Sequence, residues 1–264
     1  MNKTKNKAYK PIASIIRDNS IIGGVQYITE DQVDDLKDAD PKFAKLLKVR
    51  LNLPNESFFP SITDFHAENQ VDRIYIAGEA GCGKSTFISQ YVRAFLRKYP
   101  DSAVMMISSK NSDETLDCLP IERLAINEDI LHNPISIEEI ASKSTPCLIL
   151  FDDVEDFPTK KITDEVGRLR DKIIRTGRGI GIYCCYVHHD PCDYKATKLQ
   201  LFEASKVVIF PRRCGRGTYD YLLKNKLRVS DENIKLMANL RSNYVCINKS
   251  HPRALIADKY IILD

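Results

Sequence analysis

The sequence lacks any long hydrophobic run. The longest apolar stretches, such as residues 147–151 and 207–210, are about five residues long, whereas a membrane-spanning helix needs roughly 20. Residues 1–10 are basic, but no apolar segment of signal-peptide length follows them. We therefore expect no membrane-spanning helix, no export signal and an intracellular protein.

The sequence also lacks a complete zinc-binding pattern among its eight cysteines. Cys185, His188, His189 and Cys192 have spacings that could ligate zinc, but Cys185 lies inside a predicted strand. Structural zinc sites need a second cysteine pair to close the site, and none is present in the sequence. We therefore expect buried free thiols of the kind found in a reducing compartment.

Neither sign of charge is in large excess, since the formal net charge is +3. The balance differs along the chain, because residues 151–264 hold 21 Lys and Arg against 15 Asp and Glu, and the preceding residues are net acidic. A basic region can bind the phosphate backbone of a nucleic acid. A solvated basic surface is the equally open alternative.

Short apolar runs alternate with amphipathic stretches from residue 73 onward, without internal repeats or low-complexity segments. This alternation predicts an α/β fold with a parallel sheet that is covered by helices on both faces. The predicted strands cover residues 73–77, 103–108, 147–151, 181–187 and 206–210, and the predicted helices cover residues 84–98, 164–176, 194–203 and 219–239. Residues 244–263 predict two or three short strands, a small C-terminal β addition.

The first 70 residues have a different pattern. Residues 1–28 show no sustained period and predict a loosely ordered arm. Residues 31–49 predict one or two short helices, interrupted by Pro41, and residues 53–68 predict a loop. We therefore expect an N-terminal arm or small helical extension over residues 1–70 and the α/β domain over residues 71–264.

Residues 78–85 match the phosphate-binding pattern G-x-x-x-x-G-K-[ST] in full, between a predicted strand and a predicted helix. Glycines let backbone amides face a phosphate, and the helix N-terminus adds partial positive charge. Lys84 is expected to reach the β- and γ-phosphates, and the Ser85 hydroxyl to coordinate Mg²⁺. The predicted ATP-binding residues are Gly78, Glu79, Ala80, Gly81, Cys82, Gly83, Lys84, Ser85 and Thr86.

Two carboxylates directly follow the apolar strand at residues 147–151. Buried carboxylates are costly unless a cation accompanies them. We therefore expect Asp152 to bind Mg²⁺ and Asp153 to polarise the attacking water, although Asp153 could instead cap the following turn. Glu155 and Asp156 are weaker candidates for these roles.

One predicted strand lies between the glycine turn and the acidic strand, and another directly follows the acidic strand. This order is typical of the RecA-like additional-strand class of P-loop NTPases, in which the later strand inserts beside the phosphate-binding strand. Its carboxyl end would face the γ-phosphate and carries His188 and His189. One of them, with His188 favoured, could sense the γ-phosphate. Alternatively, both could be solvent-facing loop residues.

Arginines occur in two clusters that could act on the nucleotide of a neighbouring subunit. Arg175 and Arg178 lie near the end of a predicted helix, and Arg212, Arg213 and Arg216 follow the last core strand. An arginine supplied to the γ-phosphate can raise the hydrolysis rate by about 10³–10⁵. Surface charge and DNA contact are the alternatives for both clusters.

The chain resembles the FtsK–HerA superfamily, specifically the poxvirus-type genome-packaging ATPases of large DNA viruses and virophages. The resemblance covers residues 73–264. It extends beyond the glycine-rich motif at residues 78–85 and the acidic motif at residues 152–153. It also depends on the order and spacing of residues 108–110, 119–123, 150–154, 176–178, 193–198, 202–205, 208–211, 241–245 and 249–252. The chain departs from the family at Gly179, where His is usual, and at Lys198, where Arg is common.

The resemblance implies an ATPase that uses Mg-ATP to move double-stranded DNA into a capsid. It further implies a homo-oligomeric ring, hexameric or pentameric, that acts in the host cytoplasm (a virus factory) or in the virion. Lys198 retains charge but lacks the planar fork of arginine, so Arg178 is the favoured trans-acting residue. Residues 1–70 could bind a capsid protein or another partner.

Two other classes of function remain open. Residues 212–216 could form the arginine-bearing lid of a P-loop kinase that transfers phosphate to a small acceptor. A nucleotide-gated binding protein with negligible ATP turnover is the other alternative. Unchanged ATPase activity after Asp153→Asn would favour the binding protein.

Overall fold

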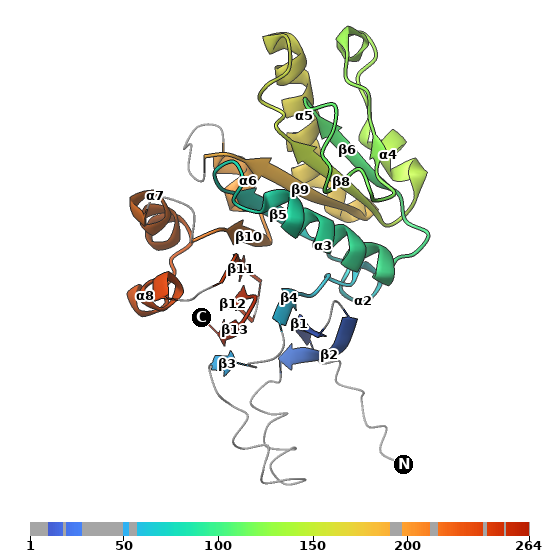
Figure 1. The fold of residues 1–264 in the computed structure, drawn as a ribbon. Helices are drawn as coiled ribbons and strands as arrows, with labels where there is room; N and C mark the ends of the chain where they lie inside the picture. Colours follow the sequence, from blue (N-terminus) through green and yellow to red (C-terminus); the bar gives the residue numbers. More distant parts are fainter. Residues whose placement is uncertain are drawn as a thin grey trace, which may run out of the picture.

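The computed structural model describes residues 10–17, 20–27, 50–52, 57–190, 197–211, 216–239, 242–250 and 252–263. These residues form a ten-stranded mixed sheet and a separate three-stranded antiparallel sheet (Figure 1). No helix in the described part of the chain combines the length and the apolar character that a membrane crossing requires.

The centre of the large sheet consists of parallel strands, as the alternating pattern predicts. The strand order is β10-β5-β9-β8-β6, so β9 lies between β5 and β8, the arrangement of the additional-strand class. Successive residues of these strands point to opposite faces and are buried on both, which explains their uninterrupted apolar sequences. The strands are β5 (Arg73–Ala77), β6 (Val104–Ser108), β8 (Cys147–Asp152), β9 (Ile182–His188) and β10 (Lys206–Ile209).

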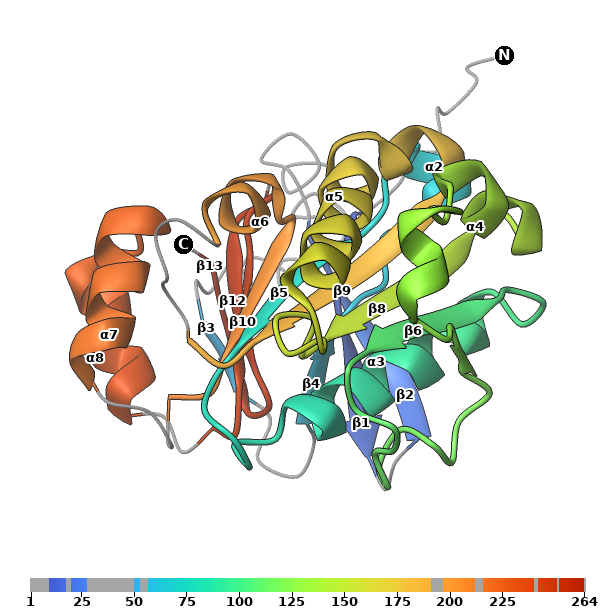
Figure 2. The ribbon, with the colours of Figure 1, turned by 90° about the horizontal axis from the view of Figure 1, so that it is seen from above.

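Helices cover both faces of these strands (Figure 2). On one face lies α3 (Lys84–Lys98), whose buried Phe87, Tyr91 and Phe95 recur at helical spacing. The other face is covered by α4 (Ile137–Lys143), α5 (Lys160–Thr176) and α6 (Lys198–Glu203). Helix α5 begins four residues before its predicted start at residue 164. Its first turn is capped by Thr159, whose hydroxyl oxygen accepts a hydrogen bond from the amide of Ile162.

The sheet continues from β10 through antiparallel strands at its C-terminal side. As predicted, residues 244–263 form short strands, and β3 (Arg50–Asn52) pairs beyond the last of them. The three strands are β11 (Val245–Asn248), β12 (Ala254–Ala257) and β13 (Tyr260–Leu263).

The segment predicted as helical over residues 219–239 is largely helical, but it is divided into two helices. The segment contains α7 (Arg216–Tyr221), a π-helical turn (Leu222–Lys226) and α8 (Asp231–Asn239). Arg228 has a φ of 52°, a left-handed conformation that ends the helical path before α8 begins.

The prediction of a loosely ordered arm over residues 1–28 is wrong where the structure describes it. The strands β1 (Lys10–Arg17) and β2 (Ser20–Tyr27) form a hairpin, and β4 (Ser57–Pro60) pairs with β1. The loop predicted over residues 53–68 is likewise wrong at β4 and at α2 (Phe65–Glu68). Buried side chains of β1 and β4 pack in the same apolar cluster as α3, a long-range contact that local periodicity does not show.

The helices predicted over residues 31–49 lie outside the described residues. The division of the chain at residue 70 stays a prediction. Phe58 and Phe59 of β4 share the apolar cluster that contains Phe87 of α3, so the N-terminal strands pack directly on the α/β core.

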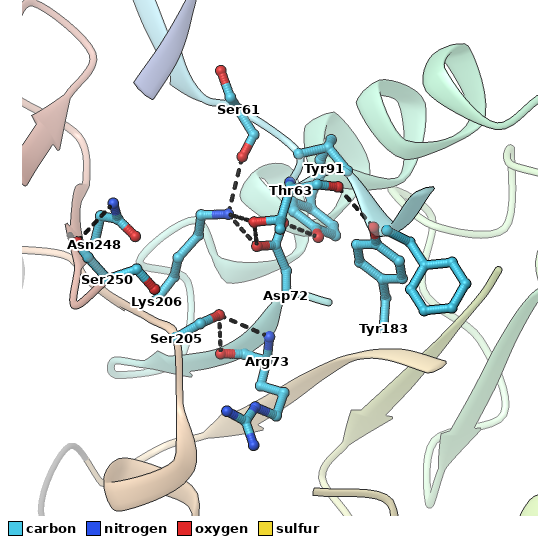
Figure 3. A network of polar contacts seen from close by, with 12 residues as sticks. Ser61, Thr63, Asp72, Arg73, Tyr91, Tyr183, Ser205, Lys206, Asn248 and Ser250 are labelled. Carbon is cyan, nitrogen blue, oxygen red and sulfur yellow. Dashed lines mark hydrogen bonds and ion pairs between the residues drawn. The ribbon is translucent and has the colours of Figure 1, made fainter. Parts of the chain in front are cut away.

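A buried ion pair fixes the amino edge of the parallel strands (Figure 3). Asp72, which precedes β5, is fully buried and pairs with Lys206, the first residue of β10. Asp72 also accepts hydrogen bonds from the hydroxyls of Thr63 (2.5 Å) and Tyr91 (2.8 Å), while Lys206 donates to the Ser61 carbonyl (2.9 Å). Burial opposes ionisation of Asp72, but the charge of Lys206 and the hydrogen bonds from Lys206, Thr63 and Tyr91 together outweigh burial and lower the pKa. This network joins the segment after β4 to α3, β5 and β10.

Candidate nucleotide-binding site

The glycine turn between β5 and α3 adopts a conformation that requires glycine. Gly81 and Gly83 have φ angles of 72° and 110°, in the left-handed region. A Cβ atom on Gly78 would lie 2.6 Å from the Cys82 Sγ atom and 3.0 Å from the Phe210 ring. Helix α3 begins after Gly83 without a side-chain cap and without an acidic residue in its first turn. Its N-terminal amides are therefore suited to an anion.

The Lys84 ammonium lies across this turn. It is 8% exposed and donates to the carbonyls of Gly78 (2.6 Å) and Glu79 (3.0 Å). Its Nζ atom also lies 3.3 Å from Nδ1 of His189. The structure therefore holds the predicted phosphate-binding lysine at the loop, paired with carbonyl oxygens that a phosphate oxygen can replace.

His189 links Lys84 to Asp153. Its Nε2 atom lies 2.6 Å from Oδ1 of Asp153. An ammonium can only donate, so Nδ1 of His189 accepts from Lys84 and Nε2 carries the proton that is donated to Asp153. The imidazole thus joins the phosphate loop to the acidic strand end through one pair of hydrogen bonds.

Asp153 is held by the loop that follows β6. Lys110 forms an ion pair with its carboxylate, and the Ser109 hydroxyl donates to its backbone carbonyl (2.7 Å). Burial opposes ionisation of Asp153, but Lys110 and His189 outweigh it, so the pKa lies below its usual value. The residue has a φ of 49°, a conformation that aspartate tolerates better than most residues. Asp153 is therefore ionised and fixed in orientation.

Asp152, the last residue of β8, differs from its neighbour. It is 7% exposed and forms no ion pair with any residue that the structure describes. Burial, followed by the charge of Asp153, raises its pKa to about 6. A buried carboxylate in this state favours a bound cation.

The Ser85 hydroxyl donates its hydrogen bond to an aspartate other than Asp152. It donates to Oδ2 of Asp113 (2.8 Å), a residue of the loop after β6. The same loop therefore makes two contacts in the site. Its Asp113 binds Ser85, and its Lys110 binds Asp153. The phosphate-binding and acidic halves of the site meet across this loop.

The residues present fit Mg²⁺ bound together with a nucleotide. Mg²⁺ in such sites takes one or two carboxylates, phosphate oxygens and waters, without an all-protein cage. In the described ranges, no group of three or more His, Cys, Asp or Glu could hold a metal ion. Ser85 and the buried Asp152 would supply the protein oxygens, and the ion would neutralise charge on the phosphates.

His188, the favoured sensor, does not face the phosphate loop with its side chain. It is buried, stacks on Tyr75 at 5.2 Å, and places Nδ1 3.3 Å from a carboxylate oxygen of Glu155. Its backbone carbonyl accepts from the amide of Gly78 (3.1 Å). His189, one residue past β9, is the histidine that contacts Lys84. The sensor role stays a prediction for either histidine.

The alternative zinc site is not formed by the described residues. Cys185 is fully buried in the cluster on the α3 face of β9, whereas His188 stacks on Tyr75, which belongs to the cluster on the opposite face. Cys192 lies outside the described residues. Successive strand residues point to opposite faces, so Cys185 and His188 cannot converge on one ion.

Arg178 lies at the other edge of the sheet from the phosphate loop. It is exposed in the turn before β9, whose carboxyl end carries His188. The seven residues of β9, at about 3.3 Å each, separate the turn that carries Arg178 from the end of the strand beside the phosphate loop by roughly 20 Å. Arg178 therefore cannot reach the nucleotide of its own chain. Arg212 and Arg213 lie outside the described residues, and Arg216 opens α7.

A groove of about 1280 Å³ begins at the phosphate loop and runs along α3. Its floor includes Gly81, Gly83 and Thr86. The opposite wall comes from the N-terminal sheet and the C-terminal strands, with Ser14, Ile16, Asn243, Asp258 and Lys259. The N-terminal strands thus form part of the cavity next to the predicted phosphate site.

Sequence reasoning did not select His189, Lys110 or Asp113 as the leading site residues. Lys110 was part of the similarity to the packaging ATPases, and it follows the strand next to β8. Carboxyl ends of adjacent parallel strands meet at one edge, so the position of Lys110 and Asp113 after β6 was the available signal. Which side chains point inward depends on loop geometry, which the sequence pattern does not give.

Known proteins resemble this chain in sequence and in fold. No family model matches the chain. It is 30% identical over 207 residues to protein V3 of Sputnik virophage, covering 78% of this chain and 80% of V3. The DNA-packaging ATPase B204 of Sulfolobus turreted icosahedral virus superimposes with a TM-score of 0.50 at 15% identity, over 71% of this chain and 97% of B204. B204 of Sulfolobus turreted icosahedral virus 2 in complex with ATP-gammaS gives 0.48 at 14%, with the same coverage.

The likeness to B204 shows a shared fold, and the identity to V3 shows a shared family. The chain therefore belongs to the family of V3, and the complete phosphate-binding motif together with the paired acids on β8 identifies it as a nucleotide-binding P-loop ATPase.

Proposed function

We propose that the protein hydrolyses ATP to translocate double-stranded viral DNA into a capsid. The observation that carries the proposal is the connection from Lys84 through His189 to Asp153. In it, one imidazole lies between the Lys84 ammonium, which would bind the phosphates, and the Asp153 carboxylate, which would activate water. This arrangement suits phosphoryl transfer to water, in which positioning and charge stabilisation supply most of the catalysis.

Nucleotide binding would change the partners of each group in this connection. The γ-phosphate would replace the carbonyls of Gly78 and Glu79 around the Lys84 ammonium. His189 would then lose Lys84 as its donor and could hydrogen-bond the phosphate, leaving one oxygen of Asp153 for the attacking water. Ser85 and Asp152 would hold Mg²⁺. The occupancy of the phosphate loop would thereby control the water-activating acid.

The nucleoside would extend along the groove beside α3. Thr86 lies on the groove side of the phosphate loop, and the groove continues from it toward Ser14 and Asn243. A nucleoside bound there would touch the N-terminal sheet as well as the α/β core. The N-terminal strands would then contribute to nucleotide affinity.

DNA translocation would require several subunits in a ring, hexameric or pentameric. Arg178 is exposed and out of reach of its own phosphate loop, so it would act on the nucleotide of a neighbouring subunit. The basic C-terminal half would supply contacts to phosphates of DNA. B204, which shares the fold, is described as a DNA-packaging ATPase. We expect such a motor in the host cytoplasm, at a virus factory, or in the virion.

The test is the steady-state ATPase rate with and without double-stranded DNA, at increasing salt, together with a mass measurement of the oligomer. We expect stimulation by DNA that falls steeply with salt, because binding releases counterions. A rate that DNA leaves unchanged at all salt concentrations would contradict translocation. Arg178→Ala should lower the rate only under conditions in which the oligomer forms.

A further inference from the structure

Asp113 lies in the candidate nucleotide site, although in the sequence it is remote from the glycine-rich motif at residues 78–85 and from the acidic pair at residues 152–153. It follows β6 by five residues and accepts the hydroxyl of Ser85 at 2.8 Å. A carboxylate has no proton to donate, so the Ser85 proton must point toward Asp113. Both lone pairs of the Ser85 oxygen are then directed away from Asp113.

The Asp113 carboxylate is held in this orientation by its own loop. Its other oxygen, Oδ1, accepts from the amides of Thr115 (2.9 Å) and Leu116 (3.2 Å). Its amide donates to Asp117 (2.8 Å), which in turn pairs with Arg123 (2.7 Å). The two oxygens of Asp113 therefore have separate partners, the loop for Oδ1 and Ser85 for Oδ2.

We propose that Asp113 is a positioning residue for the metal site. By accepting the hydrogen bond of the Ser85 hydroxyl, Asp113 orients this group so that its oxygen presents a lone pair to Mg²⁺. The inference rests on the proposed function in that Mg²⁺ accompanies the nucleotide. Asp152 then provides its carboxylate to the ion, without also orienting Ser85. The two tasks are divided between the ends of two adjacent strands, β6 and β8.

The alternative is that Asp113 only caps its own turn. Asp113→Asn separates the two roles. Two backbone amides converge on Oδ1, so the side-chain oxygen of the substituted residue would stay there and preserve the cap. Its side-chain nitrogen would face Ser85, and this nitrogen can donate but cannot accept the hydroxyl proton. Asp117→Asn is the matched control, since Asp117 supports the same loop without contacting Ser85.

The experiment is binding of a fluorescent ATP analogue by the full chain, titrated with MgCl₂ and repeated in EDTA. Since hydrogen bonds to charged groups are among the stronger ones, we expect Asp113→Asn to raise the Mg²⁺ concentration for half-maximal binding about tenfold. Metal-free binding should not change, and Asp117→Asn should match the wild type. In the Ser85→Ala background, Asp113→Asn should have no further effect.

Three results would overturn the proposal. The first is a Mg²⁺ titration of Asp113→Asn that coincides with the wild type. The second is an equal loss of binding in EDTA, which would indicate a purely structural role in the loop. The third is a full additional effect in the Ser85→Ala background. None of these measurements contains DNA, so their failure leaves the proposed translocation untouched, and an ATPase insensitive to DNA would leave Asp113 untouched.

Discussion

The two edges of the central sheet each bury a lysine and an aspartate, but they use them differently. At the amino edge, Asp72 and Lys206 pair directly and share further hydrogen bonds (Figure 3). At the carboxyl edge, Lys84 and Asp152 do not pair, and Lys84 is bound to loop carbonyls. A satisfied pair stabilises the fold, whereas separated charges leave room for phosphates and a cation. The same residue types are thus paired at one edge and held apart at the other, where we propose that they bind a nucleotide and its metal ion.

Removing the lysine of the carboxyl edge should have the largest effect on activity. Lys84→Ala is expected to lower ATP hydrolysis by at least about 10³-fold, because the charge on the phosphates loses its principal cation. The unfolding midpoint should change little, since the hydrogen-bond partners of Lys84 in the described part of the chain are two loop carbonyls and His189. Steady-state ATPase assays and thermal unfolding would measure both. Lys143→Ala, at an exposed lysine, is the control, and full activity of Lys84→Ala would refute the site.

Removing the acid at the centre of the hydrogen-bonded connection should nearly match that effect. Asp153→Asn is expected to lower turnover by about 10²–10⁴-fold, the range for loss of a general base, while ATP binding is retained. Single-turnover hydrolysis with a parallel binding assay would separate the two quantities. Unchanged turnover would instead favour a nucleotide-gated binding protein.

The amino edge should show the opposite balance of stability and activity. Asp72→Ala leaves the Lys206 charge buried without its partner and is expected to reduce the free energy of unfolding by about 3–5 kcal/mol. Urea denaturation would measure this loss. The control is Asp231→Ala, which removes an exposed pair with Lys224 and should cost at most about 1 kcal/mol. Equal losses in the two variants would show that the buried pair of Asp72 and Lys206 stabilises the fold no more than an exposed pair does.

Asp152 and Asp72 should also respond to pH with opposite signs. The pKa of Asp152 is raised to about 6. Ionisation of this group therefore reduces the stability of the folded protein, and the loss grows as the pH rises from about 4 through 6. The pKa of Asp72 is lowered, so its contribution is present above pH 4 and is lost as pH falls through the folded value.

Asp152→Asn should therefore stabilise the nucleotide-free protein at pH 7.5 by up to about 3 kcal/mol, on the basis of 1.36 kcal/mol per pKa unit. The gain should shrink at pH 5. Mg²⁺-dependent nucleotide binding should weaken in the same variant, since the metal needs an ionised ligand. Urea unfolding at both pH values would measure the gain, and an equal gain at the two pH values would contradict the raised pKa.

The smallest expected effect concerns the groove. Ser14→Trp fills the wall opposite α3 and is expected to weaken ATP binding about fivefold, or about 1 kcal/mol. Binding of tripolyphosphate, which has no nucleoside, should not change. Gln26→Trp, at an exposed position of β2 outside the groove, is the control. If the two ligands lose affinity equally, the nucleoside does not occupy the groove.

Local pattern was sufficient for much of the fold. Strand β5 and helix α3 have the predicted bounds, because a glycine turn separates an apolar run from a segment with helical spacing. The position of β9 beside β5 also followed from strand order. The N-terminal hairpin did not, because Ile12 and Ala13 are ordered by packing against residues far along the chain.

The site was only partly predictable for a related reason. The motif placed Lys84 and Ser85, and the apolar strand placed Asp152 and Asp153. Which of His188 and His189 lies against Lys84 depends on the residue at which β9 ends, and sequence patterns do not locate strand ends to within one residue. Asp113 lies in a loop without periodicity, so only coordinates bring it to Ser85.

The placement of Arg178 and the phosphate loop at opposite edges of one sheet has a consequence for assembly. If each subunit gives an arginine from one edge and receives one at the other, adjacent subunits must use two different surfaces. Such a contact is heterologous, so it excludes a two-fold dimer in which both copies use the same surface. Head-to-tail contacts either close into a ring or continue as a filament, and the rotation between neighbours alone decides which.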